Sequence, residues 1–317
     1  MKSIFTMRAV CAAVAVAGAA MIAAPAAQAA TTGSKTKYPL VLVHGFIGFD
    51  NILGIQYFYD IPNNLRKDGA TVYIASVNPS QTTEFRGEEL ILQMKQWAMK
   101  DGVKKFNLIG HSHGGPTVRY AAGTVPSMVA SATTVAGTNF GSKVADEILA
   151  NTTPDGSFNK LANAGLQLIG WLSGNMTYKQ ADLLVALGAL TTEGSATFNA
   201  QYPAGAPTSA CGQGPEVASV AGNSIRFYSF SGTAVKTNGW DISDLLLNYT
   251  STTYFKGEAN DGLVSQCASH WGKVVKDNYP WNHLDEVNQV LGTIGKDAPD
   301  PVAFYKQQAA RLKALSL

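Results

Sequence analysis

A Gly-x-Ser-x-Gly motif, Gly110-His111-Ser112-His113-Gly114, follows the apolar run 106–109 and precedes a helix-compatible segment, residues 116–122. This order of strand, sharp turn and helix is the context in which a nucleophile elbow forms. Such a turn is strained and requires glycine at Gly110 and Gly114, where a side chain would clash. It lifts the Ser112 hydroxyl above the end of a sheet and directs helix N–H groups at any oxyanion formed there.

The N-terminus has the form of a secretory signal peptide. It carries Lys2 and Arg8, continues as an Ala-rich apolar run over residues 9–26 and ends in Ala27-Gln28-Ala29. A buried or amphipathic N-terminal helix is the alternative. We expect removal of residues 1–29 and export, and no later membrane segment, because no later stretch has 18 consecutive apolar residues.

The remainder of the chain alternates strand and helix patterns, which predicts an α/β fold with a mostly parallel sheet flanked by helices, in one domain over residues 30–317. The continuous apolar run at 38–43 is typical of a strand buried on both faces. Further strands are expected at 70–75, 106–109, 130–135 and 225–230, with a weaker one at 252–255, and helices at 88–100, 284–291 and 302–315.

Residues of about 150–203 interrupt this alternation, because they carry helical patterns only. Phe158, Leu161 and Leu168 lie on one apolar stripe, with a gap at Gly165. The stripe fits an ordinary core helix or a lid. We favour a helical lid that covers an apolar cleft and opens at an oil–water interface, since the segment is inserted after the fourth strand.

Charge and cysteine content restrict the partners and the compartment. Lys2 and Arg8 leave with the leader, so 22 basic residues balance 22 acidic ones in the mature chain. A neutral balance argues against a nucleic-acid partner. Cys211 and Cys267 remain after Cys11 is removed, and in an exported protein we expect one disulfide between them, with free thiols as the alternative.

A serine hydroxyl is a poor nucleophile without a base, and the base needs a third group that fixes its tautomer. In this architecture the chain order is serine, acid, histidine. His283 lies in a Pro-marked loop before a predicted helix, where the base belongs, and His270 is the alternative. His113 lies within the turn itself, where its side chain points away from the Ser112 hydroxyl.

The acid must lie between the serine and the histidine in sequence. Asp261 is preferred because the tight turn at 259–262 would present its carboxylate rigidly, although Asp-Gly turns are also common for conformational reasons alone. Asp241 and Asp244 remain as alternatives.

An oxyanion hole needs two N–H donors. We expect one from the backbone of His113, directly after the nucleophile, and the other from the backbone of Phe46, in the loop His44-Gly45-Phe46 after the first strand. The alternative is that this loop is a simple strand-ending turn.

Four sequence blocks resemble the secreted Pseudomonas-type true lipases, which are α/β hydrolases that depend on a dedicated chaperone. The blocks are residues 41–50, 110–115, 259–264 and 282–289, and the resemblance extends over about 38–317. It implies the α/β-hydrolase fold, a Ser112, Asp261 and His283 triad, oxyanion donors at Phe46 and His113, a Cys211–Cys267 disulfide and a mobile lid at about 155–178.

The resemblance also implies a structural calcium ion, bound by Asp241, Asp285, Gln289 and the backbone carbonyl of Thr293. All of these are hard oxygen ligands, as calcium prefers. Asp285 and Gln289 stand at i and i+4, so we expect them on one helix face. The ion would hold the loop of His283 without taking part in the chemistry. Capping of the predicted helix by Asp285 is the alternative.

Two positions depart from the family pattern. Asn139-Phe140 stands where relatives carry a basic residue after the fourth strand, and Phe46 replaces a residue that is often Met. The resemblance therefore predicts neither the contacts at the base of the lid nor the acyl-chain preference.

These features predict a secreted, Ca²⁺-stabilised triacylglycerol lipase that acts on long-chain acylglycerol esters, with a periplasmic foldase as partner and no stable membrane anchor. A carboxylesterase or polyester depolymerase with the same triad is the nearest alternative. A non-catalytic binding protein on a hydrolase scaffold is the other.

Overall fold

The computed structural model describes residues 33–46, 48, 51–52, 55–152, 180–209, 211–239, 241 and 243–317, with the side chains of 51–52, 55 and 180–182 left out. These residues belong to one compact unit, Thr31–Leu317, separate from Met1–Ala30. The predicted signal peptide (1–29) and the apolar stripe of the predicted lid (158–172) lie outside the described residues.

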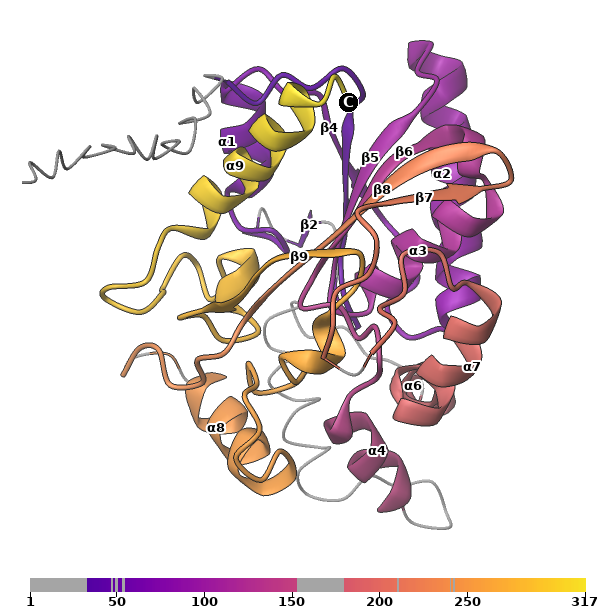
Figure 1. Ribbon diagram of the computed structural model, residues 1–317. Helices are drawn as coiled ribbons and strands as arrows, with labels where there is room; N and C mark the ends of the chain where they lie inside the picture. Colours follow the sequence, from indigo (N-terminus) through magenta and orange to yellow (C-terminus); the bar gives the residue numbers. More distant parts are fainter. Residues whose placement is uncertain are drawn as a thin grey trace, which may run out of the picture. The chain divides into compact units, whose positions relative to one another are not determined.

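The centre of the unit is a seven-stranded sheet (Figure 1). Along it the strands run β4 (Val72–Ala75), β1 (Leu40–Val43), β5 (Phe106–His111), β6 (Val129–Val135), β8 (Asn223–Gly232) and β7 (Val217–Val220), and β9 (Lys273–Tyr279) also pairs with β8. β7 pairs antiparallel with β8 and the other strand pairs are parallel. The prediction of a mostly parallel α/β sheet is therefore confirmed.

Helices cover both faces of this sheet (Figure 1). α1 (Ile61–Lys67) and α9 (Pro301–Ala314) lie on one side, and α2 (Thr83–Asp101) and α3 (Gly114–Thr124) lie on the other. Side chains of β1 alternate between the two cores: Leu40 and Leu42 pack with α1 and α9, whereas Val41 and Val43 pack with α2 and α3. This explains the unbroken apolar run, because a strand between two helical layers has no polar face.

The remaining described elements lie outside this three-layer core or connect its layers. They are β2 (Asn51–Ile52), β3 (Ile55–Gln56), η1 (Pro126–Met128), α4 (Lys143–Ala150), α6 (Gln180–Leu190), α7 (Thr192–Gln201), α8 (Ser243–Tyr254), η2 (Cys267–Ser269) and η3 (Asp285–Val287). No helix in the described part of the chain is both long and apolar enough to cross a membrane.

Two predictions of secondary structure are wrong. The weak strand at 252–255 is the end of α8, where the Thr252 hydroxyl donates to the Asn248 carbonyl one turn back and keeps the β-branched residue within the helix. The helix expected at 284–291 is only the short η3, which ends at Asn288 in the left-handed conformation, φ 62°. Asp285 and Gln289 therefore do not share a helix face.

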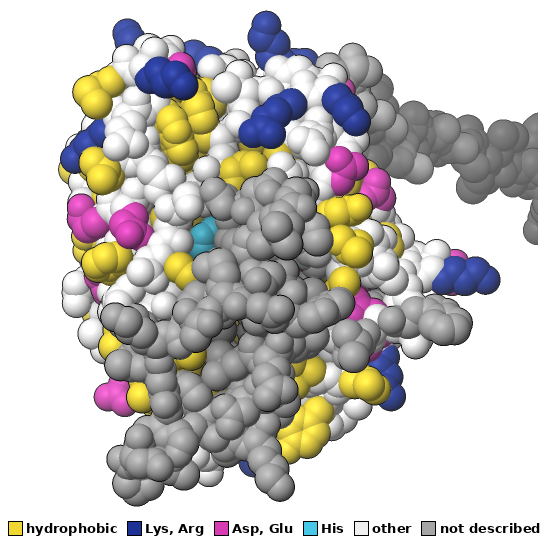
Figure 2. Space-filling model, turned by 180° about the vertical axis from the view of Figure 1, so that it is seen from behind, with side chains coloured by type: hydrophobic (Ala, Val, Ile, Leu, Met, Phe, Trp, Pro, Cys, Tyr) yellow, Lys and Arg dark blue, Asp and Glu magenta, His cyan; other side chains and the backbone are white. Residues whose placement is uncertain are grey.

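One surface of the molecule carries both signs of charge. Figure 2 shows Lys and Arg gathered mainly toward its upper edge, Asp and Glu at its sides, and hydrophobic side chains in separate patches. This mixture agrees with the balanced charge of the mature sequence.

Candidate active site

Ser112 lies at a sharp turn between β5 and α3. Its φ is 55°, a left-handed conformation that is strained for a residue with a side chain. The two glycines of the motif permit the turn. A Cβ at Gly110 would lie 2.0 Å from the Gly114 carbonyl oxygen, and a Cβ at Gly114 would lie 2.2 Å from the Val43 carbonyl oxygen. The geometry is that of the predicted nucleophile elbow.

The loop after β1 lies against this serine. A Cβ built on Gly45 would be 3.2 Å from the Ser112 Oγ, so the backbone before Phe46 passes directly beside the hydroxyl. The His113 backbone N–H precedes the first turn of α3 and needs no partner within that helix. Both expected oxyanion donors thus belong to segments that meet at Ser112.

The buried Arg86 of α2 fixes the loop after β1. Its guanidinium donates to the His44 carbonyl at 2.5 Å, to the Asn78 carbonyl at 2.6 Å and to the Thr117 hydroxyl at 3.2 Å. Burial lowers the pKa of Arg86 to about 10, so the group stays charged at neutral pH. One side chain thereby ties the loop to α2 and α3.

Phe46 closes the other side of that loop with an apolar contact. Its ring packs with Ile148 and Leu184 against a small core between α4 and α6. The bulkier side chain found here thus forms part of the wall shared with these two helices.

His283 and Asp261 form a buried pair. His283 Nδ1 donates to Asp261 Oδ2 at 2.8 Å, and the His283 backbone N–H donates to the Asp261 carbonyl at 2.9 Å. Asp261 Oδ1 accepts the backbone N–H groups of Leu263 and Val264 at 2.9 and 2.7 Å. With its two oxygens held in this way, the carboxylate fixes the tautomer of the ring and leaves Nε2 available to a substrate or to a serine.

The alternatives for base and acid have other partners. His270 Nδ1 and Nε2 bond to the Gly212 carbonyl and the Asp277 carboxylate, each at 3.0 Å. Asp244 accepts the backbone N–H groups of Thr237 and Asn238. Asp241 bonds to Ser243. The His113 ring is held by the Thr83 hydroxyl at 2.9 Å, on the side of α2.

A second histidine, His111, lies against the ring of His283. The rings of His111 and His283 are 4.6 Å apart, and His111 Nε2 is 3.3 Å from Glu286 Oε2. Burial lowers the pKa of His111 and raises that of Glu286. Sequence reasoning missed this contact, although both residues flank predicted site positions: His111 precedes Ser112 and Glu286 follows His283 by three residues.

The residues predicted to bind calcium contain two unsatisfied buried oxygens. Asp241 Oδ2 and Asp285 Oδ1 have no hydrogen-bond partner. Burial, reinforced by the charges of Asp241 and Asp244, raises the pKa of Asp285 to about 7. A cavity of about 400 Å³ reaches Asp241 and Asp244. The donor set suits a hard divalent cation such as calcium, because unpartnered buried carboxylate oxygens are ligands that it prefers.

Gln289 does not share a helix face with Asp285, and its side-chain amide is held by hydrogen bonds to the neighbouring backbone. Its Nε2 donates to the Gln56 carbonyl at 2.7 Å, and its Oε1 accepts the Leu291 N–H at 3.3 Å. The amide oxygen thus remains free to bind a second partner. Thr293 donates its N–H to the Val290 carbonyl.

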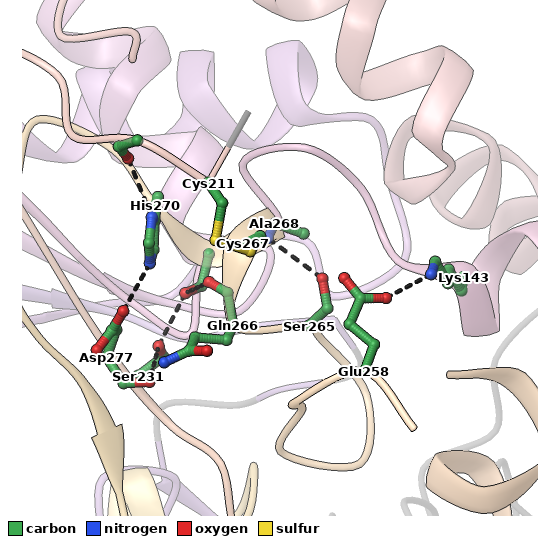
Figure 3. Close-up of a disulfide and its surroundings, with 12 residues drawn as sticks. Lys143, Cys211, Ser231, Glu258, Ser265, Gln266, Cys267, Ala268, His270 and Asp277 are labelled. Atoms are coloured by element: carbon green, nitrogen blue, oxygen red, sulfur yellow. Dashed lines mark hydrogen bonds and ion pairs between the residues drawn. A yellow bond between two sulfur atoms is a disulfide. The ribbon is translucent and has the colours of Figure 1, made fainter. Parts of the chain in front are cut away.

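A disulfide joins Cys211 to Cys267, across 56 positions of sequence. Figure 3 shows it beside the His270–Asp277 pair; Cys267 begins η2 and His270 follows the end of η2. Since Gln266 donates its N–H to the Ala259 carbonyl, the disulfide borders the turn that carries Asp261.

The segment of Asn139 and Phe140 is held by an arginine from α3. Arg119 Nη1 donates to Asn139 Oδ1 at 3.2 Å, and its guanidinium lies 3.2 Å from the centre of the Trp271 ring. Phe140 packs against the same tryptophan at 5.7 Å. A cation is therefore present behind this loop, although it comes from another element.

Comparison with known proteins gives concordant results. A family model described as the alpha/beta hydrolase fold matches residues 38–176. A triacylglycerol lipase of Vibrio cholerae is 46% identical over 289 residues, with 90% of each chain covered. One of Burkholderia plantarii is 38% identical over 329 residues, covering 94% of this chain and 92% of its own. A solved Bacillus licheniformis lipase superposes with a TM-score of 0.59 at 16% identity, over 80% of this chain and 87% of its own, which concerns the fold alone.

Proposed function

Because the chain belongs to the triacylglycerol lipase family of α/β hydrolases, we propose that it hydrolyses long-chain acylglycerol esters through an acyl-enzyme on Ser112. The observation that carries the proposal is the bond between His283 Nδ1 and Asp261 Oδ2, on loops that approach the turn of Ser112. A serine, a tautomer-fixed imidazole and a carboxylate are the parts that acyl transfer requires.

In the proposed reaction, His283 Nε2 takes the proton of Ser112 as its oxygen attacks the ester carbonyl. Asp261 stabilises the imidazolium that forms, because its second oxygen is already held by two backbone N–H groups. His283 then gives the proton to the leaving alcohol. Water repeats the sequence on the acyl-enzyme and releases the fatty acid.

The tetrahedral intermediate carries its negative charge on the former carbonyl oxygen. The backbone N–H groups of Phe46 and His113 are the proposed donors to that oxygen. Three contacts of Arg86 support the first of these, since they hold the loop that presents it. Fixed donors of this kind contribute roughly 3 kcal/mol each to the stabilisation of the transition state.

Calcium, when bound, would supply a positive charge to the cluster of Asp241, Asp285, Gln289 and the Thr293 carbonyl, and no chemistry to the ester. The unpartnered carboxylate oxygens support this assignment. Asn282 accepts the Leu284 and Asp285 N–H groups, so the cluster is continuous with the loop of His283. The proposed role is therefore structural.

From the sequence we also propose that the protein is secreted and that a foldase assists its folding. The basic start, apolar run and Ala27-Gln28-Ala29 end support cleavage after residue 29 and secretion through the periplasm. The resemblance to foldase-dependent lipases supports a periplasmic foldase as partner. The apolar stripe at 158–172 supports a lid at an oil–water interface.

The test compares hydrolysis of emulsified long-chain triacylglycerol with that of a soluble short-chain ester, in calcium, for the wild type and Ser112→Ala. We expect the wild type to favour the emulsion and the variant to lose at least ~10³-fold on both substrates. Turnover of the soluble ester alone would favour the carboxylesterase or polyester depolymerase alternative. Activity retained by Ser112→Ala would refute the nucleophile.

A further inference from the structure

Behind the turn of Ser112, the partly buried Tyr57 and the buried His111 and Glu286 form a row of polar side chains that the proposed reaction does not use. The Tyr57 hydroxyl and His111 Nδ1 are hydrogen-bonded at 2.7 Å. On the other side of the same ring, His111 Nε2 faces Glu286 Oε2 at 3.3 Å, and neither of these two side chains is exposed to solvent. The three residues come from three segments that are far apart in the sequence.

One end of the row reaches the loop of the proposed oxyanion donor. A Cβ built on Gly45 would lie 2.8 Å from the Tyr57 hydroxyl oxygen, so the Gly45 backbone packs directly against that hydroxyl. Gly45 directly precedes Phe46. The position of the Phe46 N–H is therefore tied through Tyr57 to the His111 ring.

The other end reaches the loop of the proposed base. Glu286 follows His283 by three residues, and its Oε1 accepts the Gly232 N–H at the end of β8. The His111 ring also contacts the His283 ring directly, with 4.6 Å between centroids and 45° between planes. The His111 ring thus has a hydrogen bond to Tyr57, and contacts the loop of the base through the His283 ring and the nearby Glu286 carboxyl group.

We propose that His111 is a positioning residue, which together with Tyr57 and Glu286 fixes the Phe46 N–H and the His283 ring relative to the Ser112 hydroxyl. Hydrogen bonds specify distance and direction, whereas apolar packing alone permits sliding. Reacting groups misplaced by about 1 Å lose on the order of 100-fold in rate. The inference rests on the proposed function, because it assigns Ser112 and His283 their roles.

The charge state of the row suits this role. Burial holds the pKa of His111 well below its usual range. A neutral ring does not repel the imidazolium that forms on His283 during each acyl transfer. A cationic side chain at the same place would disfavour that intermediate.

The experiment uses the full mature protein with His111→Gln, Tyr57→Phe and the double variant. His270→Gln is the matched control, because His270 is also a buried imidazole that lies beside a carboxyl group and has a hydrogen bond to an oxygen on its other side. For each variant we measure kcat and KM on a soluble short-chain ester, the rate at which a fluorophosphonate labels Ser112, and the melting temperature.

We expect His111→Gln to lower kcat by ~10- to 100-fold with KM within ~3-fold, and to slow labelling in parallel. The double variant should be no slower than His111→Gln, since groups that act as a unit are not additive. His270→Gln should lose melting temperature to a similar degree and keep kcat within ~3-fold of the wild type.

Equal kcat for folded His111→Gln and the wild type would overturn the proposal. If His111→Gln does not fold, Tyr57→Phe decides, because it removes a single oxygen; an unchanged kcat there also overturns the proposal. Failure of the proposed function is a separate result: the wild type itself would then neither hydrolyse the ester nor label with the fluorophosphonate.

Discussion

Asp285 provides a measurable link between stability, pH and calcium. Burial raises the pKa of this carboxyl from 3.8 to about 7 in the ion-free protein. The folded state therefore retains a proton that the unfolded chain has already released, and stability is lost as pH rises from about 4 to 7. At ~1.4 kcal/mol per pKa unit, the penalty is about 2 kcal/mol at pH 5 and about 4 kcal/mol above pH 7.

The perturbation is Asp285→Asn, studied in strong chelator at pH 5 and at pH 8. The amide carries no charge, so the variant escapes the penalty, and its melting temperature relative to the wild type should rise between the two pH values by roughly 4 °C, at ~2 °C per kcal/mol. Buried histidines such as His44, whose pKa burial lowers to about 3, change stability in the opposite direction. They do so equally in both proteins, so the comparison removes them.

Excess calcium should reverse the order of the two proteins at pH 8, because the ion compensates the ionised carboxylate and binds the amide weakly. The assay is thermal unfolding followed by circular dichroism at one scan rate. A difference between wild type and Asp285→Asn that is the same at both pH values in chelator would refute the burial argument. An order that calcium leaves unchanged would refute the calcium site.

Three further predictions concern the scaffold. Gly114→Ala should prevent stable folding, since the new Cβ would lie 2.2 Å from a backbone oxygen of β1, whereas Gly188→Ala, with nothing within 4 Å, should melt at or above the wild-type temperature. Arg86→Gln should lower kcat by ~10- to 100-fold with a smaller change in KM, measured on a soluble ester, because it frees the loop that it holds. Replacing Cys211 and Cys267 by Ser should cost about 4 kcal/mol in urea unfolding, because the bond closes a loop with a separation of 56 residues.

The parts of the fold that sequence predicts well are those buried on both sides. The run at 38–43 contains β1, and the runs at 106–109, 130–135 and 225–230 lie within β5, β6 and β8. β9 was not predicted, because its sequence KVVKDNY mixes charged and apolar residues in a partly exposed strand. Periodicity arguments fail where one face of an element meets water and the other meets only part of the core.

The candidate site also contains one part that the sequence predicts and one part that it does not. The motif around Ser112 predicts its own geometry, since glycine at 110 and 114 is a local requirement of the turn. The pairing of Asp261 with His283 follows from chain order and loop chemistry, and the structure brings these two side chains together. The Tyr57–His111 contact spans 54 positions. No local sequence pattern indicates it, because it exists only once the segment after β3 lies against the end of β5.

The order of the strands also determines when a chain can become reactive during synthesis. β1, β4, β5 and β6 and the turn of Ser112 all precede residue 136, whereas Asp261 and His283 follow β8 and β9, respectively, and these strands add to the far side of β6. A nascent chain released or paused before residue 283 holds its serine without the proposed base, and one stopped before residue 261 also lacks the carboxylate. If His283 is the base, as we propose, truncated products of translation should be inactive, and ester cleavage should begin only when the C-terminal third is complete.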